Sequence, residues 1–203
     1  MTNPCDASKH TNKGIRILRS SVRVLADKGM EGTKIEEVAR RAGVGKGTVY
    51  QYFDSKKALF EAAVEYATGI YGQTIIDALG EGADLSDSLC QAMRAAMQFA
   101  DRYRPAAQIL LNNPGGQPME SFQKPSLKLR RALTHCLKTT LARHQEETAD
   151  WDQEAAINVI LGTLTHLTLT RLLEEQGDQL APIDHVATAT LPVLLHGLRG
   201  PKT

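Results

Sequence analysis

Residues 33–53 read TKIEEVARRAGVGKGTVYQYF, and this segment predicts two short helices on either side of a tight turn. Thr33 and Glu36 have the spacing of a capping box, in which a hydroxyl and a carboxylate bond to free backbone amides at a helix start. The apolar spacing carries this helix to about residue 42. Glycines at positions 43 and 45 permit the positive φ that such a turn can require.

A second short helix is expected over residues 46–53. Ala39 lies on the first helix, Val44 in the turn and Val49 on the second helix, so these side chains can pack the two helices together. The outer face of the second helix is then free to enter a major groove. The segment therefore predicts a helix-turn-helix.

The whole chain predicts an all-α fold of about nine helices, because apolar residues recur at helical spacing and no stretch alternates with a period of two. Gly29 is expected to end the first helix, and Ser86 to cap a later one. A loop rich in Gly and Pro is expected over residues 112–118. The other expected helices cover residues 9–28, 56–71, 86–102, a short segment after Pro105, 126–145, 152–175 and 183–198.

The composition is that of a globular protein, with 203 residues of which 42% are hydrophobic. Three widely spaced cysteines form neither a disulfide framework nor a zinc ribbon. The polar first ten residues lack the apolar core of a secretory signal. Residues 155–170 carry too many polar side chains for a membrane span. We expect a cytoplasmic protein with no membrane partner.

Charge is distributed unevenly along the chain. Residues 1–60 hold 12 Lys and Arg against six Asp and Glu, whereas residues 61–203 hold 12 against 17. A small basic part joined to a larger acidic part is typical of a domain that meets the phosphate backbone and a body that does not. A solvated charged face is the alternative explanation.

Catalytic, metal and cofactor sites find no support in the sequence. Residues 43–48, GVGKGT, fail the phosphate-loop pattern because Gly47 follows Lys46. The six histidines show no zinc-ligand spacing, and no nucleophile motif is present. We expect no catalytic residue, no metal and no cofactor.

The second helix of the motif combines side chains that DNA binding uses. Lys46 can reach a phosphate or a guanine edge, and Gly47 allows close approach of the backbone. Thr48 and Tyr50 offer hydroxyls and apolar contacts to thymine methyl groups. Gln51 can pair with adenine through two hydrogen bonds. Nearby Phe53 and Phe60 fall on the inward stripe and are assigned to the core.

Residues 15–60 resemble the N-terminal domain of the TetR family of bacterial transcriptional regulators, through the run GVGKGTVYQYF and the segments before and after it. The family often has Ser where Gly45 stands, so a hydroxyl cap is missing here. The resemblance implies a helix-turn-helix DNA-binding domain over residues 1–54 and a ligand-binding and dimerisation domain over residues 55–203. It implies base-reading positions at Lys46, Gly47, Tyr50 and Gln51, and phosphate contacts at Thr33, Thr48, Tyr52 and Lys56.

The last two helices, about residues 152–175 and 183–198, are apolar nearly all round and predict a homodimer, because a partner must cover their second side. The family resemblance adds a ligand-responsive repressor on a palindromic DNA operator. An effector pocket for a small molecule is expected between about residues 89 and 172, with residues 112–118 as a mobile rim or a plain connection. Its expected lining is Met93, Met97, Phe99, Ile109, Leu110, Phe122, Asn158 and His166.

Two other functions stay open on the sequence. A helical enzyme with no recognisable catalytic motif would turn over a substrate without sequence-specific DNA binding. An architectural DNA-binding protein without an effector would have a well-filled core in place of the pocket.

Overall fold

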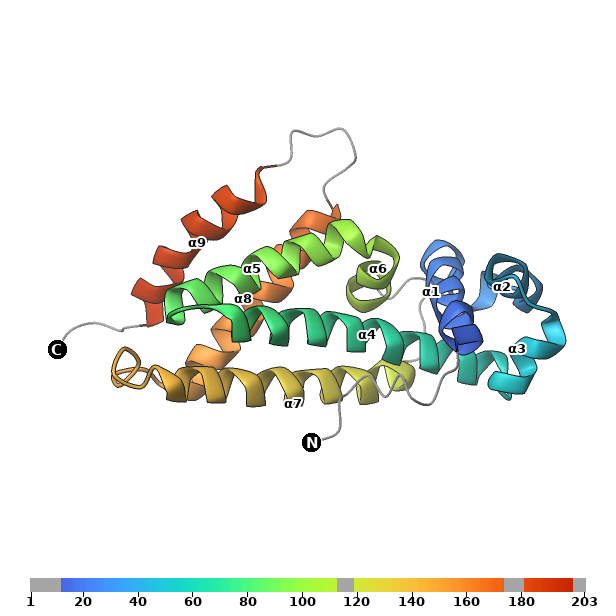
Figure 1. Ribbon diagram of the computed structural model, residues 1–203, viewed down its shortest axis with the longest axis horizontal. Helices are drawn as coiled ribbons and strands as arrows, with labels where there is room; N and C mark the ends of the chain where they lie inside the picture. The colour runs from blue at the N-terminus through green and yellow to red at the C-terminus, as the bar shows by residue number, and fades with distance from the viewer. Residues whose placement is uncertain (1–11, 113–118, 174–180, 199–203) are drawn as a thin grey trace. The chain divides into compact units, whose positions relative to one another are not determined.

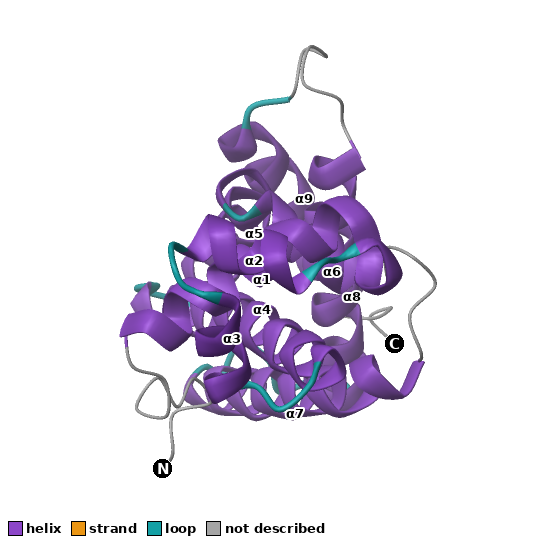
Figure 2. Cartoon of the chain, turned by 90° about the vertical axis from the view of Figure 1, so that its right-hand side faces the viewer, coloured by secondary structure: helices purple, strands orange, loops and turns teal. Residues whose placement is uncertain are grey.

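The computed structural model of the chain describes residues 12–112, 119–173 and 181–198, and within them every regular element is a helix (Figure 2). The all-α prediction is confirmed. Figure 1 labels the helices in chain order. Their bounds are α1 Asn12–Gly32, α2 Ile35–Ala42, α3 Lys46–Tyr52, α4 Lys56–Glu81, α5 Leu85–Arg102, α6 Arg104–Asn112, α7 Met119–Arg143, α8 Gln153–Leu173 and α9 Ile183–Leu198.

The turn between α2 and α3 forms as the sequence predicts. Gly43 adopts the left-handed conformation, with φ of 64°, and its amide donates to carbonyls of the last turn of α2. This is the usual glycine termination of a helix. The guanidinium of Arg16, on α1, donates to the carbonyls of Ala42 and Gly43, where the negative end of the α2 dipole lies. Gly45 is extended, with φ of −73°, so only one of the two glycines is required for its conformation.

The start of α2 differs from the predicted capping box. Lys34 is the N-cap residue, and no side chain caps the helix. The Thr33 hydroxyl instead donates to the carbonyl of Gly29 over 2.6 Å, because Gly29 interrupts α1 with φ of 64° and leaves that carbonyl without its helical partner. The predicted end of the first helical segment at Gly29 is confirmed, and the capping box is wrong.

One apolar core holds the first three helices and the start of α4 together. Val49 of α3 is 1% exposed, Ala39 of α2 is 3% exposed and Phe53 is 5% exposed, with Val44 packed at the margin. The same core contains Leu59, from the first turn of α4. Burial of each such Val, Leu or Phe side chain stabilises the fold by about 1.5–3 kcal/mol. This core fixes which face of α3 points outward.

Packing divides the chain into two compact units: Met1–Gln73 with Tyr103–Leu129, and Thr74–Arg102 with Arg130–Thr203. In the first unit α1 packs against α2 and α6. The helices α4 and α7 each contribute to both units. This grouping by contact does not follow the boundary between residues 54 and 55, which rests on the motif and stays a prediction.

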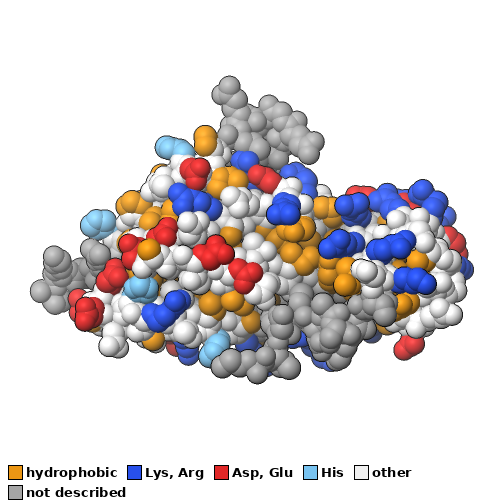
Figure 3. Space-filling model, in the orientation of Figure 1, with side chains coloured by type: hydrophobic (Ala, Val, Ile, Leu, Met, Phe, Trp, Pro, Cys, Tyr) orange, Lys and Arg blue, Asp and Glu red, His pale blue; other side chains and the backbone are white. Residues whose placement is uncertain are grey.

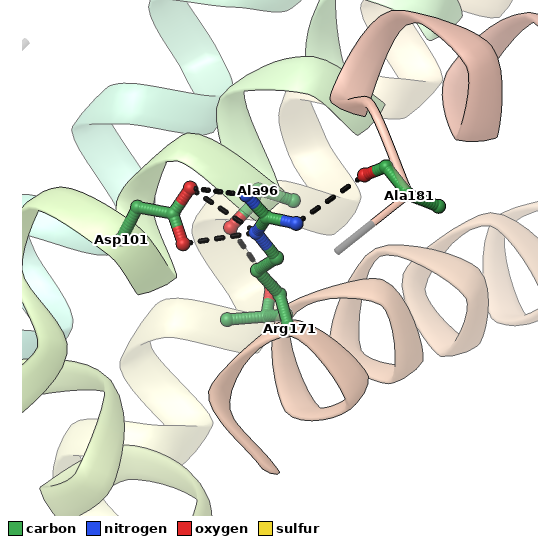
Figure 4. A network of polar contacts seen from close by, with 5 residues as sticks. Ala96, Asp101, Arg171 and Ala181 are labelled. Carbon is green, nitrogen blue, oxygen red and sulfur yellow. Dashed lines mark hydrogen bonds and ion pairs between the residues drawn. The ribbon is translucent and has the colours of Figure 1, made fainter. Parts of the chain in front are cut away.

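Within the second unit, α5 packs against α8 and α9, and charged groups join the three helices. Arg171 of α8 forms a two-pronged ion pair with Asp101 of α5, with both N–O distances at 2.9 Å, and donates to the carbonyl of Ala181 (Figure 4). Arg94 of α5 binds Asp184 of α9 at 2.7 Å. These contacts hold the start of α9 against α5.

Other helix starts also differ from the predictions. The N-cap of α5 is Asp84, whose carboxylate accepts the Asp87 amide over 2.7 Å, and not Ser86. The helix α7 begins seven residues before the predicted start and contains Pro125. Of the predicted loop at residues 112–118, Asn112 ends α6 and the remainder lies outside the described residues.

The helix α8 follows the buried side chain of Trp151, the only tryptophan of the chain. By length and composition α8 alone among the described helices would suffice to cross a membrane. The core helix of a soluble protein passes the same test, and 39% of this apolar stretch is buried. Its apolar character is therefore weak evidence for a membrane.

Candidate nucleic-acid interface

The helix α3 presents a polar face to the surrounding solvent. With Val49 and Phe53 buried, the helical period places Lys46, Gly47 and Gln51 on the exposed side. The Tyr50 side chain is 43% exposed, so its ring and hydroxyl are accessible to a partner. Thr48 and Tyr52 are half-buried. The predicted DNA-binding residues of this stretch thus share one short helix, with those assigned to base reading exposed.

Cations surround this face. Figure 3 shows Lys and Arg side chains gathered over α1, α2 and α3. A groove-binding helix needs such a surface because each duplex phosphate carries a negative charge. The exposed cations of these helices are Lys13, Arg16, Arg19, Arg23, Lys28, Arg40, Arg41 and Lys46, with Lys34 next to α2.

Most acidic groups near α2 are bound to cations of the same unit. Glu37 accepts from Lys28 over 2.6 Å and lies 3.4 Å from Arg41, which also contacts Asp27. The hydrogen bond from Lys28 is the main cause of a lowered pKa of the Glu37 carboxyl. These pairs join α1 to α2 and leave Arg40 on the exposed side.

The N-terminal end of α3 carries an exposed ion pair. The Lys46 ammonium lies 2.6 Å from the Glu36 carboxylate of α2, and the two side chains are 54% and 62% exposed. Their hydrogen bond lowers the pKa of Glu36 and raises the pKa of Lys46, so both groups are charged at neutral pH. The predicted base-reading lysine therefore already has an anionic partner in the free protein.

The residues assigned to phosphate contacts are differently placed. The Thr33 side chain is 3% exposed and its hydroxyl is bound to Gly29, so it faces the protein interior. Lys56 is half-buried and donates from Nζ to the carbonyl of Glu31 over 3.1 Å, at the end of α1. The Tyr52 ring packs near Phe53, with ring centroids 6.4 Å apart. Their roles toward phosphate stay predictions.

The residues predicted for the effector pocket are not gathered in one interior region. Met93, Met97 and Phe99 of α5 are at most 3% exposed. Asn158 and His166 of α8 are exposed, and Asn158 accepts a hydrogen bond from Arg130 over 2.8 Å. These two polar groups lie on the surface of the subunit, which differs from the prediction. The remaining members are Ile109, which is buried, Leu110, which is half-buried, and Phe122, whose side chain is outside the described set.

Two side chains near α3 have roles that the sequence pattern does not reveal. The pattern assigns Glu36 to helix capping and gives Arg16 no role. Glu36 meets Lys46 across a turn, ten residues along the chain, and Arg16 reaches Gly43 from another helix. The sequence carries no local signal for either contact. Among the described residues, no group of three His, Cys, Asp or Glu is suited to hold a metal ion.

The segment that forms this interface matches a known protein family. Residues 17–63 match the family described as bacterial regulatory proteins, tetR family. The matched range covers α2, α3 and the turn between them. It also includes the apolar core that holds them to α1.

Two curated relatives come from Bacillus subtilis strain 168. The uncharacterised HTH-type transcriptional regulator YerO is 44% identical over 55 residues, which are 27% of this chain and 19% of YerO. The uncharacterised HTH-type transcriptional regulator YdgC is 24% identical over 199 residues, which are 94% of this chain and 95% of YdgC. The chain thus spans about a fifth of the first relative and nearly all of the second.

Two solved structures share the fold along most of the chain. The transcriptional regulator FadR from Bacillus subtilis, in complex with stearoyl-CoA, superposes with a TM-score of 0.69 at 19% identity over 90% of this chain and 98% of FadR. AibR, in complex with isovaleryl coenzyme A and operator DNA, gives a TM-score of 0.68 at 17% identity over 91% of this chain and 98% of AibR. At these identities the likeness concerns the fold alone.

Proposed function

We propose that this chain, whose residues 17–63 match the tetR family of bacterial regulatory proteins, is a transcriptional repressor. In this proposal it binds a palindromic operator as a homodimer and releases the operator in response to a small molecule. It acts on DNA in the cytoplasm and has no catalytic role. Its relatives YerO and YdgC are transcriptional regulators, which supports this reading.

The polar face of α3 is the observation that carries this proposal. The buried Val49 packs the helix against the core, while Lys46, Tyr50 and Gln51 are exposed on its outer side. A helix of this width fits the major groove, where each base pair presents its own pattern of donors and acceptors. The cations around it supply attraction to phosphate that does not depend on sequence.

Selection of bound duplexes from a random pool tests the DNA-binding proposal and gives the operator. With that operator, Gln51→Ala should cost about 1–3 kcal/mol and relax preference at one base pair. Lys56→Ala should weaken every sequence alike and reduce the salt slope by about one. A pool without enrichment, or a Gln51→Ala protein with unchanged affinity and preference, would contradict this docking of α3.

Exposed apolar side chains on α8 and α9 support the homodimer. Val159 is 47% exposed, Leu173 is 62% exposed and Val193 is 74% exposed. A subunit with such side chains on its last two helices gains by covering them with a second copy, because apolar surface is removed from water. Two recognition helices related by a two-fold axis then meet DNA about one helical turn, ~34–36 Å, or more apart.

Light scattering of a charged variant tests the dimer. Val193→Glu places a carboxylate in the proposed interface, where burial without a partner is unfavourable, and should shift the mass at micromolar concentration to that of one subunit. Leu127→Glu is the matched control, because Leu127 is also an exposed apolar residue, 53% exposed, but lies on α7. A monomeric wild-type protein, or equal effects of both variants, would contradict the interface.

We propose an acyl-CoA as the class of effector to test first, because FadR and AibR are structures with stearoyl-CoA and isovaleryl coenzyme A. The apolar side chains of Met93, Met97 and Phe99 on α5 would contact the acyl group. Effector and DNA affinities should be coupled by about 1–3 kcal/mol, and reciprocally. Titration with both thioesters and with free coenzyme A, read as operator affinity, tests it; indifference to all three would exclude this class.

A further inference from the structure

The ion pair between Glu36 and Lys46 joins the two helices of the motif at the point where they present their outer faces. Lys46 is the first residue of α3, and Glu36 lies in the first turn of α2. The Nζ–Oε1 distance is 2.6 Å, and both side chains are more than half exposed. Exposed ion pairs of this kind contribute little to folding. Because this pair lies beside the exposed polar face of α3, it can affect how that face meets DNA.

We propose that Glu36 is a specificity-determining residue that positions the Lys46 ammonium for a base edge and withholds it from the phosphates. This inference rests on the proposed DNA-binding function. Lysine is a flexible chain that ends in a compact charge, so an unrestrained Lys46 would take whichever phosphate oxygen comes nearest. An ammonium has three donors. One is occupied by Glu36, and two are left for a guanine O6 and N7.

The Glu36 carboxylate also acts on DNA directly. It is an exposed negative charge at the rim of a face that meets phosphates, so it weakens attraction to every duplex. Only a duplex that offers acceptors at the place where Glu36 holds Lys46 recovers this loss. The carboxylate thus lowers general affinity and raises discrimination between sequences. The lowered pKa of Glu36 means that this charge persists throughout the neutral pH range.

Glu37 provides a matched control one residue away. It has the same charge and lies on the same turn of α2, but it is bound to Lys28 and Arg41. A change at Glu37 removes one negative charge from the unit without releasing Lys46. Glu36→Asp is the complementary variant, because it keeps the charge and withdraws the oxygens by one methylene.

The experiment measures affinity for the selected operator and for a scrambled duplex by fluorescence anisotropy at fixed salt. Glu36→Gln should bind the scrambled duplex about two- to five-fold more tightly than the wild type does, the factor that corresponds to one exposed ion pair. The operator should gain less, so the ratio of the two affinities falls. Glu36→Asp should lower the ratio as well. Glu37→Gln should raise both affinities by the same factor and leave the ratio unchanged.

A Lys46→Ala background decides whether the effect passes through Lys46. There, Glu36→Gln should no longer change the affinity ratio. An unchanged ratio in Glu36→Gln, or the same fall with and without Lys46, overturns the inference while the proposed DNA-binding function stands. A wild-type protein that prefers no duplex over the scrambled one overturns both. Circular dichroism of each variant confirms that the helices are retained.

Discussion

The helix-turn-helix and the last two helices differ in the exposure of their apolar side chains. In α3, Val49 is 1% exposed and the outer face is polar. In α8 and α9, Leu173 and Val193 are 62% and 74% exposed. The first region completes its core within the subunit and keeps charged and hydrogen-bonding groups for a partner. The second leaves apolar side chains exposed, which the proposed homodimer would cover. Under the proposed function, the two regions meet chemically different partners.

The largest expected effect separates buried from exposed apolar side chains. Leu59→Ala removes a side chain that is 2% exposed and belongs to the N-terminal core, and should lower the free energy of unfolding by about 2–5 kcal/mol. Val193→Ala should change it by less than about 0.5 kcal/mol when the sample is dilute enough to keep subunits apart. Urea unfolding measures both. Equal losses of unfolding free energy in the two variants would contradict this contrast between buried and exposed apolar side chains.

The next effect concerns the turn of the motif. Gly43→Ala should cost about 1–2 kcal/mol, because φ is 64° there and the added Cβ would lie 2.7 Å from Arg16 Nη2. Gly45→Ala is the control, since that backbone is extended and the nearest atom lies 3.9 Å away. Thermal and urea unfolding give the two values. If Gly45→Ala were the more costly variant, the assignment of the turn would be wrong.

Gly47→Ala should separate folding from function. Gly47 lies in α3, and the place that an added Cβ would take is open space, so alanine should stabilise the helix by up to about 1 kcal/mol. The same methyl group would stand between the backbone and the DNA, so operator affinity should fall. We expect a protein that is more stable and binds less tightly. Unchanged operator affinity would show that the backbone does not approach the duplex here.

The smallest effect is an absence of pH dependence. The folded pKa of Glu36 is lowered, so its contribution to stability is present above its unfolded pKa and is lost only as the pH falls through the folded pKa. The folded pKa of Lys46 is raised, so its contribution is lost only as the pH rises through that value. Between about pH 6 and pH 9 the difference in unfolding free energy between wild type and Glu36→Gln should be constant. A slope in that range would contradict the charged pair.

Sequence reasoning succeeds where one residue type satisfies one backbone requirement. Gly43 marks the turn because a left-handed residue is needed there, and Val49 marks the buried side of α3. It fails at helix starts with several possible acceptors. Asp84 and Ser86 can each cap a helix, and Thr33 can bond backward to Gly29 as well as forward. Such choices depend on which backbone group tertiary packing leaves free.

The predicted effector pocket shows a second limit of pattern reasoning. The helix α8 is apolar over most of its surface, so its period does not distinguish the side that faces α5 from the side that faces outward. The prediction places Asn158 and His166 inward, whereas both are exposed. Similarly, the prediction starts a helix at about residue 126, whereas α7 begins at Met119 and includes Pro125. The partner of Lys46 across the turn has no local signature at all.

The single tryptophan gives the protein a built-in optical reporter. Trp151 is 8% exposed and belongs to the second compact unit. The helix-turn-helix contains tyrosines but no tryptophan. Emission excited at the red edge of indole absorption therefore originates in the second unit, to which α8 and α9 belong. A shift of that emission during titration would report a rearrangement of the second unit without any attached dye. The anisotropy of a labelled duplex would report DNA binding by the helix-turn-helix. The two signals can be recorded in one cuvette, so the order of the proposed ligand capture and DNA release can be timed.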